Sequence, residues 1–309
     1  MAETIAATRA GADVLTPLGP ESLTWRYFGL MAGFAYGAVP QLLQLMHPLL
    51  GHAVEEHSNV KDDPFDRLIR SMGPIYGVIY DGPEAATTAV AVRRFHEQIT
   101  GDLPDGERYS ALNPEVFHWA HATFVHALIY GSSTVLGPFS RAEQERLYAE
   151  SRQWYRLYGM TMRTVPETLD EFDACWDQYV HDVLEHTAAA HWLLATFRAP
   201  PAPPGFGPVR RQLWRLVRRP LGYAAVVYAS GLLPPPARER LGLPWSRARY
   251  VQYDVIRRLV RTSVRVTPIR YRYHPRPLAG WRREAGLRGV SVRSLVNASG
   301  GRRRTVGAQ

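Results

Sequence analysis

Eleven histidines are the first side chains of this sequence that could do chemistry. An imidazole can hold a metal ion or transfer a proton near neutral pH, and a buried imidazole needs a hydrogen-bond partner or a metal. Helical spacing brings His96 and His121 close to apolar helix faces. These two residues are therefore the candidates for a buried cofactor ligand.

The positions of His96 and His121 follow from a rotation of 100° per residue. The first face is formed by Val92, Phe95 and Ile99, and the second by Phe117, Phe124 and Leu128. His96 lies about 70° from the centre of the first face, at its edge, and His121 about 40° from the centre of the second. A buried histidine is more often a hydrogen-bonded core residue than a ligand, so both readings stay open.

A second polar group lies on the helix expected after Pro64. Arg67, Arg70 and Ser71 lie about 100° to 160° from the centre of its apolar face, formed by Phe65, Leu68, Ile69, Met72, Tyr76 and Ile79. The simple reading is a solvated polar face. The other reading is that a large, partly anionic body packs on this side, with Gly73 and Gly77 allowing close approach.

Other motifs are weaker. No HExxH, CxxC, GxGxxG, P-loop or GxSxG pattern occurs. A non-haem iron site remains an alternative, with ligands drawn from His47, His57, His96 and His121 together with Glu55 or Glu56. His181, His186 and His191 recur every five residues. That spacing rotates around a helix, so we expect them at the surface.

The elements that must position these residues are predicted to be almost all helical. The expected helices are 21–38, 40–55, 64–80, 83–99, 114–132, 140–158, 166–187, 188–197, 208–232, 235–241 and 246–265. Prolines at first helical positions and the capping box from Ser140 to Glu143 support their starts. Residues 264–273 are the best strand candidate, although Pro268 interrupts them.

The fold class is thus all-α, with one large helical domain at 15–265 and an Arg-rich extension at 266–309. We expect this extension to be poorly ordered from about residue 276. With 46% hydrophobic residues, the chain can build a sizeable core. The single cysteine, Cys175, agrees with a reducing cytoplasm. No signal peptide is evident, and residues 27–54 are too often broken by Gly, Pro, Gln and His to read as a membrane span.

The net charge of +9 is unevenly distributed. Residues 255–309 carry fourteen arginines and one acidic residue, Glu284, so the rest of the chain is net negative. The basic tail predicts weak attraction to an anionic membrane. Its aromatic residues are too few for a stacking platform, so we expect no specific nucleic-acid partner.

Several stretches, in order, resemble the rubber-oxygenase catalytic-domain family. This family includes the latex clearing proteins and the fungal oxygenase that cleaves the farnesyl side chain in mycophenolic acid biosynthesis. The chain looks most like its uncharacterised actinobacterial-type members. The matching stretches are Pro17 to Arg26, Leu42 to Pro48, Glu56 to Ser58, Asp63 to Ser71, Arg93 to His96, Tyr109 to Pro114, Trp119 to His121, Leu232 to Pro235 and Arg238 to Pro244.

The resemblance implies a globin-like helical core, haem b with its iron, and oxygenase activity on an apolar, isoprenoid-type substrate. His96 matches the proximal ligand, opposite which O₂ would bind. Arg67 and Ser71 match the arginine and threonine near the haem, and Arg70 stands where some members have a lysine ligand. Because a guanidinium stays protonated, Arg70 cannot readily ligate iron. His57 is a weak candidate for a distal acid or base.

Three alternatives remain open from the sequence. His121 competes with His96 for the iron, a non-haem iron enzyme could use the His/Glu cluster, and the protein could bind haem without catalysis. The expected location is the cytoplasm or the periphery of a membrane.

Overall fold

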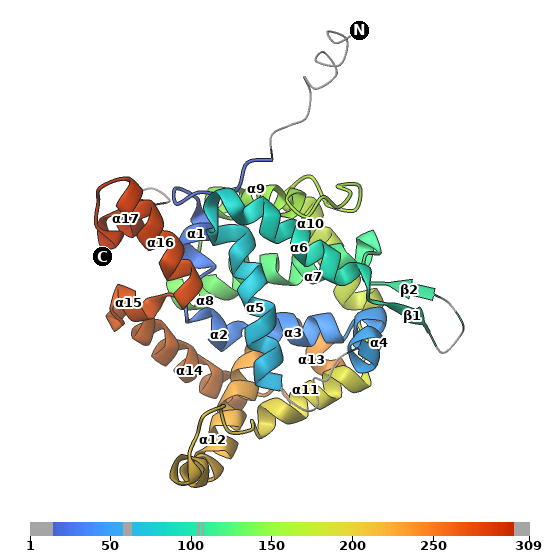
Figure 1. The fold of residues 1–309 in the computed structure, drawn as a ribbon. Helices are drawn as coiled ribbons and strands as arrows, with labels where there is room; N and C mark the ends of the chain where they lie inside the picture. Colours follow the sequence, from blue (N-terminus) through green and yellow to red (C-terminus); the bar gives the residue numbers. More distant parts are fainter. Residues whose placement is uncertain (1–14, 58–63, 104–105, 107, 300–309) are drawn as a thin grey trace.

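The computed structural model describes residues 15–299 apart from 58–63, 104–105 and 107, and it confirms a predominantly helical single domain (Figure 1). The N-terminal half contains α1 (Leu23–Tyr27), α2 (Gly33–Tyr36), α3 (Ala38–Leu45), α4 (Pro48–His57), α5 (Pro64–Tyr80), α6 (Ala85–Glu97) and α7 (Pro114–His126). The only described sheet has two antiparallel strands, β1 (Thr100–Asp102) and β2 (Arg108–Ser110), which project from the body between α6 and α7.

The second half is also helical. It contains α8 (Ser132–Leu136), α9 (Arg141–Arg156), α10 (Leu169–Gln178), α11 (Ala188–Arg198), α12 (Pro208–Leu232), α13 (Pro235–Arg240), α14 (Arg247–Val266), α15 (Ile269–Arg272), α16 (Pro275–Leu287) and α17 (Val292–Ala298). π-Helical turns follow α7 at Ala127–Gly131 and α10 at Tyr179–Val183. The long prediction at 166–187 therefore ends early.

The helix starts follow the capping chemistry expected from the sequence. Asn113 Oδ1 accepts a hydrogen bond from the backbone N–H of Glu115 at 3.0 Å, and Pro114 takes the first helical position of α7. Ser140 and Glu143 form the predicted capping box of α9. Local sequence signals therefore fix the starts of α9 and of α7, the helix that carries His121, whereas α6, which carries His96, begins without a side-chain cap.

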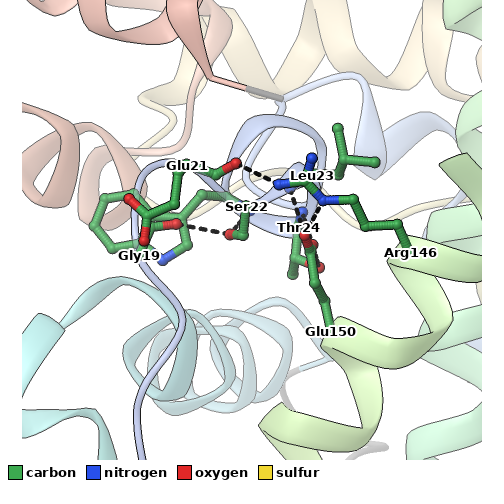
Figure 2. A network of polar contacts seen from close by, with 8 residues as sticks. Gly19, Glu21, Ser22, Leu23, Thr24, Arg146 and Glu150 are labelled. Carbon is green, nitrogen blue, oxygen red and sulfur yellow. Dashed lines mark hydrogen bonds and ion pairs between the residues drawn. The ribbon is translucent and has the colours of Figure 1, made fainter. Parts of the chain in front are cut away.

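A buried carboxylate joins α9 to α1 across the core. Glu150 accepts hydrogen bonds from the backbone N–H groups of Leu23 at 3.0 Å and Thr24 at 2.8 Å (Figure 2). It also accepts from the Thr24 hydroxyl at 2.9 Å and from Arg146 Nε at 3.0 Å. The N–H groups in the first turn of α1 have no acceptor within the helix, and the Glu150 carboxylate is the acceptor for two of these groups.

Two sequence predictions about the C-terminal region were wrong. Residues 264–273 are not a strand, because α14 continues to Val266 and α15 begins after Pro268. The extension is also not poorly ordered over its described part. Trp281 of α16 is fully buried and meets Trp25 edge-on, with 5.3 Å between ring centroids. Helix α16 packs on α5 and so belongs to the core.

No helix in the described residues is long and apolar enough to cross a membrane. The expected helices 21–38 and 40–55 were wrong in their bounds: the chain leaves the helix after Tyr27, re-enters at α2, and Pro40 lies inside α3 and not between two helices.

Candidate functional site

His96 lies near the C-terminal end of α6, which packs on α5. The buried stripe of α6 runs from Ala85 through Ala89 to Val92, and His96 continues it one turn later. Phe95, which the sequence analysis placed on the apolar face, is 70% exposed. The true stripe is therefore rotated toward His96, whose ring packs edge-on against Phe117 at 5.6 Å.

The hydrogen bond of His96 determines which ring nitrogen is free. Its Nδ1 lies 2.8 Å from the carbonyl oxygen of Val92, one turn earlier in the same helix. A carbonyl can only accept, so Nδ1 carries the proton. Burial lowers the pKa of His96, which favours the neutral ring. Nε2 then carries a lone pair, and among the described residues it has no hydrogen-bond partner. Histidine ligands of metals are commonly held in this way.

His121 lies in a different environment on α7. Its ring is buried against Trp154 at 4.6 Å and Tyr155 at 5.0 Å, and both of these aromatic residues are fully buried. Neither ring nitrogen makes a well-aligned hydrogen bond among the described residues, but the backbone of Ser151 lies close enough to the ring to oppose part of the pKa shift that burial causes. Burial, together with nearby His118, lowers the pKa of His121 to about 3. The ring is thus a neutral core group inside a closely packed aromatic shell.

Phe117 and Tyr158 lie between the two histidines. Phe117 contacts His96 at 5.6 Å and Tyr158 at 5.3 Å, and Tyr158 lies 6.3 Å from His121. The Tyr158 hydroxyl accepts a hydrogen bond from Trp154 Nε1 at 2.9 Å. The two candidate ligands therefore contact the same aromatic cluster through different rings, His96 through Phe117 and His121 through Tyr158.

His57 faces the hairpin instead of this cluster. Its Nε2 lies 3.1 Å from the carbonyl oxygen of Thr100 in β1, and the residue is exposed. Glu56, the residue before His57 in α4, accepts a 2.6 Å hydrogen bond from the Tyr109 hydroxyl. His52 Nε2 is 3.6 Å from the same carboxylate. The sequence analysis named Glu56 and His57 but missed their contacts with the hairpin, because Thr100 and Tyr109 reach them only through the fold.

The predicted polar group of α5 can be placed only in part. Arg67, Arg70 and Ser71 belong to the first half of α5, but their side chains lie outside the described residues. The direction in which these side chains point therefore stays a prediction. Their helix runs beside α6, which carries His96.

The alternative non-haem site finds no support in the described part of the chain, where no three His, Cys, Asp or Glu side chains are grouped to hold a metal. His47 is buried near Tyr179, whereas His57 lies at the hairpin. Three further histidines, predicted to lie at the surface, are indeed exposed: His181, His186 and His191.

Comparison with known proteins identifies the domain. Residues 25–262 match the family model of the ER-bound oxygenase mpaB/B'/rubber oxygenase catalytic domain. An uncharacterised protein of Mycobacterium tuberculosis and one of Mycobacterium bovis are each 25% identical over 235 residues, which covers 74% of this chain and 88% of the relative. No solved structure matches. The family match confirms the resemblance seen in the motifs, and the chain belongs to the mpaB/rubber oxygenase catalytic-domain family, a family of oxygenases.

Proposed function

We propose that this oxygenase depends on haem b and acts on an apolar substrate, with an unsaturated isoprenoid chain as the first type to test. The observation that carries the proposal is the hydrogen bond between His96 Nδ1 and the Val92 carbonyl. It fixes the tautomer and leaves Nε2 as the ligand atom. When bound, haem b would supply the iron at which O₂ is activated.

His96 is favoured over His121 as the ligand for a steric reason. A porphyrin needs a broad flat space beside the coordinating nitrogen. The ring of His121 is enclosed by Trp154, Tyr155 and Tyr158, all of them buried. His96 is only partly buried and lies at the end of its stripe, next to the exposed end of α6. We assign His121 the role of a core residue beside the site.

The polar residues of α5 would complete the site on the side opposite His96. A guanidinium at Arg67 or Arg70 can pair with a haem propionate or donate a hydrogen bond, and neither can act as a ligand because arginine stays protonated. The Ser71 hydroxyl can donate a hydrogen bond as the family's threonine would. His57, the last residue of α4, remains a candidate acid or base.

Absorption spectra of three proteins prepared identically test this proposal. The wild type, reconstituted with haem b, should show a Soret band that persists in His121→Ala and is lost or strongly shifted in His96→Ala. Oxygen consumption with an isoprenoid alkene then tests the activity. A folded wild-type protein without a Soret band would rule out haem dependence. Haem binding without oxygen consumption would indicate a haem-binding protein that is not an oxygenase for this substrate class.

A further inference from the structure

The first turns of α12 expose an apolar face to solvent. Val209 is 74% exposed, Leu213 59% and Leu216 72%. Steps of four and three residues place these side chains on one face of the helix, and Pro220 extends the same face. A surface helix of a globular protein normally turns such a stripe inward. This part of α12, which extends away from the body at the lower edge of Figure 1, turns its apolar stripe toward solvent instead.

Contacts on the other side of the helix hold this orientation. Trp214 is partly buried, and its Nε1 donates a hydrogen bond to the carbonyl oxygen of Pro200 at 3.0 Å. At Gly222, a Cβ would lie 2.3 Å from the carbonyl oxygen of Arg198, so α12 approaches the end of α11 too closely for any larger residue. The apolar face therefore cannot turn inward without breaking these contacts.

The same helix is strongly basic. Residues 208–232 contain five arginines and no acidic residue. The five are Arg210, Arg211, Arg215, Arg218 and Arg219. Within the described part of the chain, none of them forms an ion pair. Arg210 and Arg219 flank the apolar face, each about 90° from its centre on opposite sides, and the other three arginines lie about 130° to 170° from that centre.

We propose that the exposed face of α12 (Val209, Leu213 and Leu216, with the arginines beside it) docks this protein on an anionic lipid surface. An amphipathic helix with a basic polar side lies in the membrane interface by burying its apolar face among the acyl chains, while its cations meet the lipid phosphates. The tail considered in the sequence analysis is not needed for this contact.

Charge favours a lipid surface over the other occupants of an apolar face. Two copies of α12 packed face to face would bring together arginines that have no carboxylates between them, and like charges repel. Nucleic acid would satisfy the arginines but not the exposed leucines, because its recognition rests on phosphate contacts and stacking aromatics. Of these three occupants, an anionic lipid interface satisfies both features.

Flotation of the full-length protein with lipid vesicles tests this inference. Vesicles of phosphatidylcholine alone are compared with vesicles of phosphatidylcholine and phosphatidylglycerol in equal parts. We expect binding to the anionic vesicles that weakens with added salt. Leu213→Glu combined with Leu216→Glu should reduce this binding by at least about tenfold, because two large apolar side chains are withdrawn from the acyl region.

Leu287→Glu provides the matched control, since Leu287 on α16 is equally accessible, at 77% exposure. It should change vesicle binding less than about twofold. Thermal unfolding by circular dichroism confirms that all variants are folded. The inference is wrong if the wild type does not float with anionic vesicles, or if both variants lose binding equally. A wild-type dimer that the double variant dissociates, without vesicle binding, would assign the face to a second copy. These readouts do not require haem, so they are independent of the proposed function.

Discussion

At the residue scale, we expect the buried carboxylate of Glu150 to stabilise the folded protein. Replacing it by Ala leaves two buried N–H groups of α1 and the Thr24 hydroxyl without their acceptor. Each unpaired buried donor costs about 1–3 kcal/mol, so with three such donors we expect the free energy of unfolding to fall by about 3 kcal/mol or more in urea titrations. Glu150→Gln retains one acceptor oxygen and should lose less.

Glu145 is the control on the same helix. It is an exposed residue whose ion pair with Arg141 spans 2.9 Å. Such pairs contribute little, so Glu145→Ala should change the unfolding free energy by less than about 1 kcal/mol. Equal losses from Glu145→Ala and Glu150→Ala would contradict the role assigned to Glu150.

The buried imidazole of His121 should make the free energy of unfolding depend on pH. Its pKa is lowered from 6.5 to about 3 in the folded protein. Below pH 6.5 the unfolded chain gains a proton that the folded chain does not accept until about pH 3. The stabilisation is therefore complete above pH 6.5 and is lost as the pH falls through this window. The His121 contribution has a slope of about 1.4 kcal/mol per pH unit.

His121→Leu should remove this part of the pH dependence. The difference in unfolding free energy between pH 6.5 and pH 4.5 should shrink by about 2–3 kcal/mol relative to the wild type. An unaltered pH dependence in His121→Leu would mean that the imidazole is not buried as described.

At the element scale, α16 is a core helix despite its arginines. Arg276 of α16 binds Asp81 after α5 through two contacts of 3.0 and 2.5 Å, and it donates to the carbonyl oxygen of Gly73 at 2.8 Å. Trp281→Ala should lower the unfolding free energy by about 3–5 kcal/mol, because it opens a large cavity beside Trp25. Leu287→Ala on the same helix, at an exposed position, should cost less than about 0.5 kcal/mol. Similar values for both would show that α16 is not docked.

The sequence predicted most helices because local signals mark their starts. Asn113 with Pro114 and Ser140 with Glu143 act within one turn, so no tertiary information is needed. The wrong predictions concern segments whose structure depends on packing against distant parts of the chain. The sequence analysis missed the apolar stripe of α16, formed by Leu278, Trp281 and Ala285, because the region is rich in arginine. The alternation in residues 264–273 indicated a strand, but α14, which packs on α12, continues through its first three residues to Val266.

At the scale of the whole molecule, the C-terminal helices close the core of the family domain. The family match ends at residue 262, yet Tyr273 and Trp281 are buried beyond it. The division at residue 265 stays a prediction, and truncation tests it. A chain ending at residue 265 should unfold at markedly lower urea concentration than one ending at residue 299, because Trp25 and Tyr80 lose the cover of α16. Equal stability of the two chains would support an independent domain at 15–265.

For the candidate site, helical periodicity predicted which histidines lie inside but not what surrounds them. Helical periodicity brought His96 and His121 to the interior, and the structure agrees. Periodicity could not show that Nδ1 of His96 is occupied by Val92, or that His121 is enclosed by Trp154 and Tyr155, because these facts depend on side-chain geometry and on contacts between distant helices. It also placed Phe95 inward, because its hydrophobicity outweighed the two small alanines that define the true stripe.

The central claim is that Nε2 of His96 holds the iron of haem b, and replacing His96 by Gly tests it most directly. The variant should purify with little haem, and imidazole added to the solution should restore haem content and the wild-type absorption spectrum by occupying the vacated position. His121→Gly, treated in the same way, should need no imidazole. If His96→Gly keeps the wild-type haem content and spectrum without imidazole, His96 is not the ligand and the account of the site fails.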